Sequence, residues 1–423
     1  MHLRRAIISL LLVAFGSIAA AGDGASLESQ EERAAKLTTV IKGSSLMSYA
    51  PDDPLLFPER DSATALLQTR FTLRREHGSR ANSEVAYEQR ARFVSEGTQR
   101  AFGGRVLPDR TDVPFRIDQL RWPISEEGDT FAWSHEVDRA LVAFHPSWGE
   151  VTAGRQAIGL GRGVLFGALD LFAPFAPLAA DREWRPGVDA FRAEYRLSPT
   201  ISTELIAAFG ESPDRSAYLA RARGYLGSTD AEVIVGKRAE DTLLGMALSS
   251  VVGGAEIHGE MALFDTPGNS PDSGLFGSDD LFCQAVLGSS YTFDIGKGLT
   301  LLAEYHYSGF GVREAEDALA RLSDPAFQKR FLRGDVQILG RHALALRGSY
   351  PFAPDLRASA LVLGSPNDGS GVFSPSLRWD WTEKTTITAT GFLPWGPGPA
   401  RGRLRSAYGG RPTSLFLQIA TYF

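Results

Sequence analysis

Residues 63–76 read ATALLQTRFTLRRE, a stretch in which apolar and polar side chains alternate. Successive side chains of an extended strand point to opposite faces. A strand here therefore places Leu67 and Phe71 on one face and Gln68 and Arg70 on the other. Such a strand belongs between an apolar medium and water, as in a soluble β-sandwich or in a barrel that crosses a membrane.

The same alternation recurs along the chain in segments of about 10 residues separated by turn residues, which is typical of a transmembrane barrel. Tyr and Trp gather near segment ends, as in GLTLLAEYHYS (298–308) and GVFSPSLRWDW (371–381). Aromatic side chains of this kind favour membrane interfaces. Because an open sheet edge in lipid leaves backbone groups unpaired, the sheet must close. We therefore predict an all-β fold, a closed antiparallel transmembrane β-barrel.

About 18 segments fit the pattern, and the spacing between them keeps a count of 16 open. Short connections mostly follow even-numbered segments and long ones odd-numbered segments, which predicts short periplasmic turns, longer outer loops and both termini in the periplasm. Two gaps break this rule, a long one after the second segment and a tight one after the ninth. The predicted strands are 63–75, 83–95, 115–124, 134–146, 149–157, 187–197, 200–210, 217–227, 230–238, 241–251, 254–264, 281–294, 298–309, 340–351, 354–364, 371–382, 384–395 and 413–423.

The two ends of the chain point to export and membrane insertion. Residues 1–21 combine a basic start, the apolar run AIISLLLVAFGSIA and small residues, which predicts a signal peptide cleaved after Ala21. The last residues, PTSLFLQIATYF (412–423), resemble the C-terminal strand of Gram-negative outer-membrane barrels. That resemblance implies an outer-membrane location and recognition of the strand ending at Phe423 by the barrel-assembly machinery. Thr421 departs from the pattern, which often has an aromatic residue there.

Two segments outside the predicted strands also carry a prediction. Residues 22–62 are expected to form a periplasmic N-terminal tail before a barrel domain at 63–423. Within this tail, 28–43 either forms a short helix or stays solvated. Residues 310–339 contain REAEDALARLSDPAFQKRF, which predicts one or two short helices in an outer loop.

Composition narrows the possible functions. The chain has 423 residues, a single Cys and a formal net charge of −6, and loss of Arg4 and Arg5 with the signal peptide makes it more negative. One Cys excludes a disulfide framework and Cys-cluster metal sites. The negative charge gives no reason to expect nucleic acid as a partner. His135, His145 and His258 lie on separate segments without metal-ligand spacing, so we expect neither a metal nor another cofactor.

The most distinctive stretch is VTAGRQAIGLGRGVLFGALDLFAPF (151–175), followed by REWRPGVDAFRAEYRL (182–197). Gly-Arg-Gln, a glycine-containing bend, Leu-Asp-x-Phe-x-Pro and Arg-Pro-Gly-Val-Asp resemble porin-like barrels related to the alginate-export and phosphate-selective porin types. The resemblance covers about 45 residues and implies a channel in the outer membrane, without a substrate. The spacing of Gly159, Gly161 and Gly163 also approaches a dinucleotide fingerprint, but no βαβ unit follows it.

Charged residues on the polar faces are the candidates for selectivity. Arg155 and Arg162 flank glycines, so their guanidinium groups can reach Asp170 or Asp181 in a loop folded against the wall. These contacts either pin the loop as structural ion pairs or form a selectivity constriction. Both signs of charge share the polar faces, as expected of a diffusion pore. The pore-lining or constriction candidates are Arg155, Arg162, Asp170, Arg192, Glu194, Arg196, Glu304, Arg347 and Arg378.

One enzyme hypothesis arises from the sequence, because His306 and Ser308 share a face with Glu304 and the motif resembles that of outer-membrane phospholipase. In that family the Ser and His face the lipid, whereas the alternation here turns them into the lumen. We therefore expect no enzymatic activity. The sequence predicts a porin-like channel for passive or facilitated diffusion of small hydrophilic solutes. The alternative is a barrel that acts as a scaffold or export conduit for a periplasmic partner.

Overall fold

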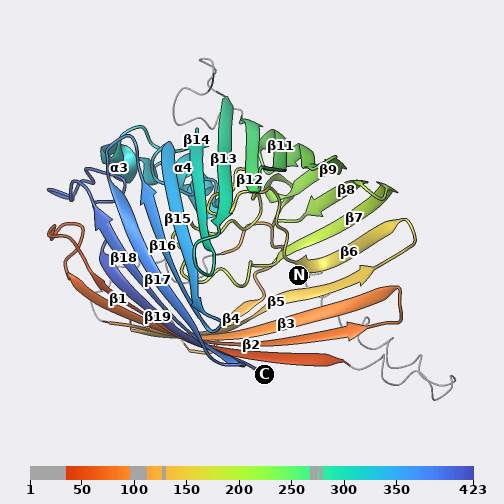
Figure 1. Cartoon of the computed structure of the whole chain (residues 1–423), viewed down its shortest axis with the longest axis horizontal. Coiled ribbons are helices and arrows are strands. Elements are labelled where there is room, and N and C mark those ends of the chain that lie inside the picture. Colours follow the sequence, from red (N-terminus) through yellow and green to blue (C-terminus); the bar gives the residue numbers. More distant parts are fainter. Residues whose placement is uncertain (1–34, 96–111, 126–129, 267–274, 276–279) are drawn as a thin grey trace.

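The computed structural model describes residues 35–95, 112–125, 130–266, 275 and 280–423. The predicted signal peptide lies outside these residues. Antiparallel strands follow one another around a ring in sequence order (Figure 1). The ring is closed because the first strand pairs with both the second and the last. The prediction of a closed antiparallel barrel is confirmed.

Eighteen long strands form the wall within the described residues, together with one three-residue strand, β4. Their bounds are β1 Lys36–Tyr49, β2 Asp61–Glu76, β3 Ala81–Val94, β4 Arg121–Pro123, β5 Phe131–Phe144, β6 Gly149–Gln156, β7 Val188–Ser198, β8 Ile201–Ala208, β9 Ala217–Leu226, β10 Thr229–Arg238, β11 Asp241–Val252, β12 Ala255–Asp265, β13 Leu281–Phe293, β14 Leu299–Ser308, β15 His342–Ala353, β16 Leu356–Gly364, β17 Gly371–Thr382, β18 Thr385–Trp395 and β19 Thr413–Tyr422.

Two predicted boundaries are wrong, and the errors offset each other in the strand count. Lys36–Tyr49 is strand β1, so the barrel begins before residue 63 and the helix proposed for 28–43 does not form over its described part. Gly43, Ser44 and Ser45 interrupt the alternation there, and the pairing that makes this segment a strand comes from β19 at the other end of the chain. Residues 115–124 contain only the short β4.

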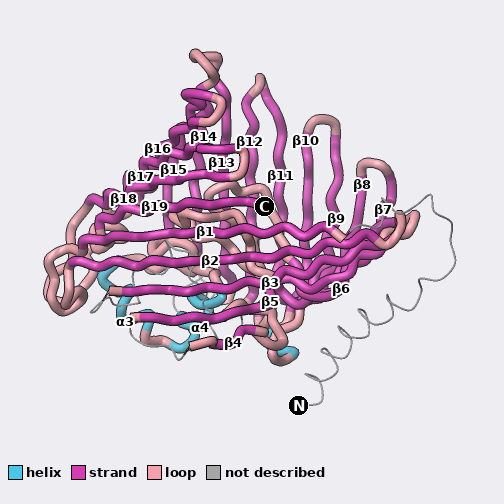
Figure 2. Tube along the Cα trace, turned by 90° about the horizontal axis from the view of Figure 1, so that it is seen from below, coloured by secondary structure: helices cyan, strands magenta, loops and turns pink. Residues whose placement is uncertain are grey.

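With these corrections, short turns and long loops alternate more regularly along the chain. With β1 counted and 115–124 removed, tight turns such as 77–80 and 145–148 lie at one end of the barrel, which we call the turn end. Long connections such as 157–187 and 309–341 lie at the other, the loop end. The tight connection between β10 and β11 remains the exception. The predicted helices in 310–339 are confirmed as α3 (Ala318–Leu322) and α4 (Pro325–Arg333), which lie near the loop end (Figure 2).

The wall has its apolar side chains outside and its polar side chains inside. Leu67 and Phe71 are exposed, whereas Gln68 and Arg70 of the same strand are buried, as the alternation predicts. Leu415 and Ile419 of β19 are likewise exposed. The backbone of Phe423 pairs with Thr39 of β1, so the last residue belongs to the closing seam. Among the described residues, no helix is long and apolar enough to cross a membrane.

The alternation predicts a polar interior along the whole barrel, but part of the interior is apolar. Near the loop end, inward side chains of β7–β13 such as Ile206, Leu219 and Phe264 are apolar and form a buried cluster with connecting segments. Near the turn end, inward side chains such as Arg223 and Arg378 are charged and partly exposed. The lumen therefore has a packed half and a polar half.

Candidate constriction site

Residues 157–187, which connect β6 to β7, form the inner loop and turn into the barrel instead of leaving it (Figure 1). Ile158, Leu169 and Phe172 are buried in the apolar cluster near the loop end. Leu165 and Phe166 join a second buried cluster with Leu302 and Ile338. These apolar contacts hold the inner loop across the lumen, where its remaining polar groups need partners.

Glu260 of β12 supplies partners for the first bend of the inner loop. Its carboxylate accepts the backbone N–H groups of Arg162 (2.7 Å), Gly163 (3.2 Å) and Leu169 (3.3 Å), and that of Ala168. A Cβ atom at Gly161, where φ is +84°, would collide with this carboxylate. The glycines that approach a dinucleotide fingerprint therefore cradle an anion, but the anion is the protein's own carboxylate.

Glu304 of β14 holds the next turn of the loop in the same way. It accepts the backbone N–H groups of Val164 (2.6 Å), Leu165 (2.8 Å) and Phe166 (3.1 Å), and its Oε1 lies 2.9 Å from Nε2 of His258. The side chain is fully buried. Glu304, predicted to line the pore, is thus an anchor for the inner loop.

Arg182 ties the two sides of the inner loop together. Its guanidinium donates to the carbonyl oxygens of Val164 (3.0 Å), Ala176 (3.0 Å) and Pro177 (2.7 Å). It forms no ion pair with any described residue. Burial, together with the like charge of Arg347, lowers the pKa of Arg182 to about 10. Arg347 is paired with Leu302, which packs with Leu165 and Phe166 of the inner loop, so its strand position lies beside the loop.

The far side of the inner loop binds the closing seam of the barrel. Lys42 of β1 lies 2.6 Å from Asp181 and 2.8 Å from Glu183, and its ammonium sits over the ring of Trp184. On β19, Gln418 donates to Asp181 and Tyr422 donates to Glu183. Burial alone would raise the pKa of Asp181, but Lys42 and the hydrogen bonds hold it below its ordinary value.

Lys42→Met is expected to lower the free energy of unfolding by about 3 kcal/mol, because it leaves the buried carboxylate of Asp181 without its cation. The measurement is the urea midpoint of the protein refolded in lipid vesicles. Lys36→Met, on the same strand at an exposed position, is the matched control and should stay near wild type. Equal midpoints for the two variants would contradict a structural role for Lys42.

Arg155 and Arg162 form ion pairs, but with different partners from those predicted. Arg155 binds Asp189 of β7 through two nitrogens, at 2.7 and 2.9 Å. Arg162 pairs with Asp230 of β10. Asp170 pairs instead with Arg185. Ion pairs of Arg162 and Arg185 thus involve this loop, while the predicted pairing of Arg155 or Arg162 with Asp170 or Asp181 is wrong.

A chain of alternating charges runs along the inner wall from β7 to β10. Arg192 binds Glu204, Glu204 lies 3.1 Å from Arg221, and Arg221 binds Glu232. Nearer the turn end, Glu194 lies 3.2 Å from Arg223. These residues balance one another within the wall and leave no excess of either sign.

The remaining predicted site residues lie apart from this chain. Arg347 of β15 is partly exposed, and its side chain makes no hydrogen bond or ion pair with any described residue. Arg378 lies 3.3 Å from Asp380 at an exposed position, and Arg196 is exposed near the turn end. The structure thus gathers Arg162, Asp170 and Glu304 around the inner loop, with Arg347 near them, and leaves Arg196 and Arg378 outside it.

The enzyme hypothesis finds no supporting geometry. His306 faces inward, as predicted, and stacks on Phe166 with ring centroids 4.9 Å apart. Neither ring nitrogen has a hydrogen-bond partner among the described residues. Ser308 accepts a hydrogen bond from Gln284 instead. The described residues also contain no group of three or more His, Cys, Asp or Glu side chains arranged to hold a metal ion.

A second connection, 309–341, packs beside the inner loop. Helix α4 begins after Asp324, whose side chain accepts the Ala326 N–H, and ends at Gly334. Its Arg330 and Arg333 bind Asp241 at 2.8–3.0 Å, and Arg333 also binds Asp335 at 2.6 Å. Three cations, counting Arg238, hold the pKa of Asp335 well below its ordinary value against the effect of burial.

The barrel resembles several solved structures. OccAB1 of Acinetobacter baumannii matches with a TM-score of 0.55 over 92% of this chain and 96% of that chain, at 9% sequence identity. The fold is that of an outer-membrane porin. OccK9 (OpdG) and OccK8 (OprE) of Pseudomonas aeruginosa also have TM-scores of 0.55, at 11% and 10% identity over 92% of this chain and 98% of theirs.

The porin fold confirms the barrel part of the resemblance seen in the sequence. No family model matches the chain. No curated protein matches it. Sequence identity at this level shows the fold and says nothing of the solute or of the roles of individual residues.

Proposed function

We propose that this chain is an outer-membrane channel for passive diffusion of small hydrophilic solutes, narrowed by the inner loop. The observation that supports this most is the loop itself, which two wall carboxylates hold across the lumen through backbone N–H groups. A loop that the wall fixes on several sides would narrow the route of solutes through the lumen and leave that route open. A barrel of this strand number is wide enough to need such a constriction to select among solutes.

The test is the current through purified protein in planar bilayers. Discrete single-channel steps in potassium chloride are the expected result. Bilayers that stay silent, with protein shown to be folded by its resistance to heat in detergent, would overturn the proposal and favour the scaffold or export-conduit alternative. In that case, a periplasmic protein should co-purify in stoichiometric amount.

Within this channel, Arg347 is the proposed selectivity residue. It is the predicted site residue that carries a charge beside the inner loop without a described ion-pair partner, and Arg182 adds a second cation near it. A ring of fixed positive charge favours anions at a constriction. Arg155 is not proposed as a selectivity residue, because its charge is neutralised by an ion pair with Asp189.

Arg347→Glu is expected to shift the reversal potential in a potassium chloride gradient toward cation selectivity. The substitution replaces a cation without an ion-pair partner, beside the inner loop, by an anion. Arg357→Glu makes the same change of charge on the neighbouring strand β16 at an exposed position, and should move the reversal potential less. Equal shifts for the two variants would place the selective region outside the inner loop.

A further inference from the structure

One part of the barrel wall is not built from a full strand. Strand β6 pairs with β5 only along residues 140–144 of β5 and ends at Gln156, where the chain enters the lumen. Beyond that point, the edge of β5 is covered by β4, which pairs with β5 at residues 134–136. Among the described strands, β4 pairs with β5 alone. The place that β6 leaves is thus filled by residues 113–125 of the β3–β5 connection, here called the wall segment.

Among the described residues, scattered backbone hydrogen bonds rather than a continuous ladder hold the wall segment to its neighbours. Beyond the β4 pairing, Val137 N–H donates to Leu120, and Ile124 N–H donates to Trp133. On the other side, Asp189 N–H of β7 donates to the carbonyl of Phe115 at 2.9 Å. Phe115 and Leu120 adopt φ values of 57° and 46°, which are strained for residues with a Cβ atom.

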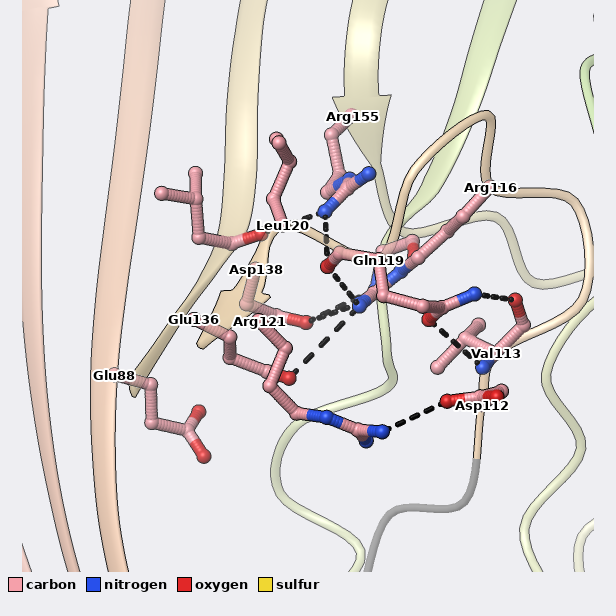
Figure 3. Close-up of polar contacts among 12 residues, drawn as sticks. Glu88, Asp112, Val113, Arg116, Gln119, Leu120, Arg121, Glu136, Asp138 and Arg155 are labelled. Carbon is pink, nitrogen blue, oxygen red and sulfur yellow. Dashed lines mark hydrogen bonds and ion pairs between the residues drawn. The ribbon is translucent and has the colours of Figure 1, made fainter. Parts of the chain in front are cut away.

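Two buried arginines take the place of the missing ladder (Figure 3). Arg155 donates to the carbonyl oxygens of Asp118 and Gln119, and also to that of Val137. Arg116 donates to Gln119 at 3.3 Å and to Gly187 at 2.7 Å, and lies 3.1 Å from Asp138. Backbone groups in a membrane wall must be satisfied from within the protein. These guanidinium groups meet that need where the strand is interrupted.

The two faces of the wall segment differ in character. Trp122 and Ile124 are exposed on the outside of the barrel, where the neighbouring strands present apolar side chains. On the inside, Phe115 packs edge-on against Phe172 of the inner loop, with ring centroids 5.4 Å apart. Displacing the wall segment would therefore connect the inner loop directly with the lipid side.

We propose that the wall segment 113–125 is a lateral gate, through which an amphipathic anion passes between the lumen and the membrane. Opening removes the carbonyl oxygens of Asp118 and Gln119 from Arg155, whereas Arg116 belongs to the wall segment and moves with it, away from Gly187 and Asp138. The freed N–H donors suit a carboxylate, sulfonate or phosphate head group, which a guanidinium binds in a forked geometry. An apolar tail would meet Phe115 on the lumen side and Trp122 and Ile124 on the outer side.

The experiment locks the wall segment with a disulfide. Trp122 and His135 are directly paired across β4 and β5, a spacing that a disulfide can bridge, so the variant is Trp122→Cys with His135→Cys in a Cys283→Ala background. The probe is a pyrene-labelled alkyl sulfonate enclosed in proteoliposomes, whose appearance in the bilayer is followed by excimer fluorescence. Single-channel conductance is recorded on the same samples.

Oxidation of this variant is expected to slow entry of the sulfonate into the bilayer by at least tenfold, and reduction should restore it, while ion conductance stays unchanged. The matched control places Cys at Leu244 and Leu263, a pair in the continuous ladder of β11 and β12, and oxidation there should change neither signal. Equal transfer from the locked and reduced forms would overturn the gate. Silent bilayers with intact, lockable transfer would overturn the diffusion channel but not the gate.

Discussion

Glu304→Gln is expected to raise the mean single-channel current by roughly twofold or more and to make it noisier, because in the proposed channel the inner loop narrows the lumen. The glutamine keeps the size of the side chain but puts an NH2 group opposite backbone N–H donors. Val164 donates to one carboxylate oxygen and Leu165 and Phe166 to the other, so at least one of these N–H groups loses its acceptor when a single amide oxygen remains. Each buried N–H without a partner costs about 1–3 kcal/mol, enough to shift the loop toward a released state by about a hundredfold.

The control for this variant is Glu256→Gln, which removes an exposed carboxylate from the inner face of β12 without touching the inner loop. Its conductance should match that of wild type. A Glu304→Gln channel with unchanged, quiet steps would show that the apolar contacts alone fix the loop, and that Leu165 and Phe166 rather than the carboxylate set the width of the path.

Arg155→Ala is expected to destabilise the folded barrel by about 3–5 kcal/mol, because it leaves the partly buried Asp189 unpaired and withdraws donors from three carbonyl oxygens. The measurement is the urea midpoint in lipid vesicles. Arg378→Ala removes an exposed ion pair with Asp380 and should cost less than about 1 kcal/mol.

The opposite outcome for Arg155→Ala would be as informative. If the midpoint stays at the wild-type value while ion selectivity changes, then Arg155 belongs to the constriction, as the sequence had left open. The bidentate contact with Asp189 and the burial of the guanidinium argue for the structural role.

The faces of the strands could be predicted from the sequence because they depend on a local period of two. Leu67 and Gln68 differ in exposure for no reason beyond their order in the chain. Strand β1 was missed because its alternation is weak around Gly43, and the strand that completes it, β19, lies at the far end of the chain. The segment 115–124 was overpredicted because it does cover the wall, although its left-handed residues prevent a regular strand.

The partners of the charged residues could not be predicted, since they depend on how loops fold inside the barrel. Arg155 reaches Asp189 because β6 and β7 are paired, and Arg162 reaches Asp230 because the inner loop crosses toward β10. The alternation along β12 places Glu260 on the inner face of its strand, but it gives no sign that this carboxylate anchors the inner loop. The only sequence signal for this role is the group of glycines around residue 161, whose backbone can approach an anion closely.

The binding of the inner loop to Lys42, Gln418 and Tyr422 has a consequence for biogenesis. These three side chains come from the first and last strands, so the docking place for Asp181 and Glu183 does not exist until the two ends of the polypeptide have met. These contacts therefore form only when the ring closes. A barrel whose first and last strands have not yet paired would hold its inner loop through Glu260, Glu304 and the apolar clusters, but not at Asp181 and Glu183.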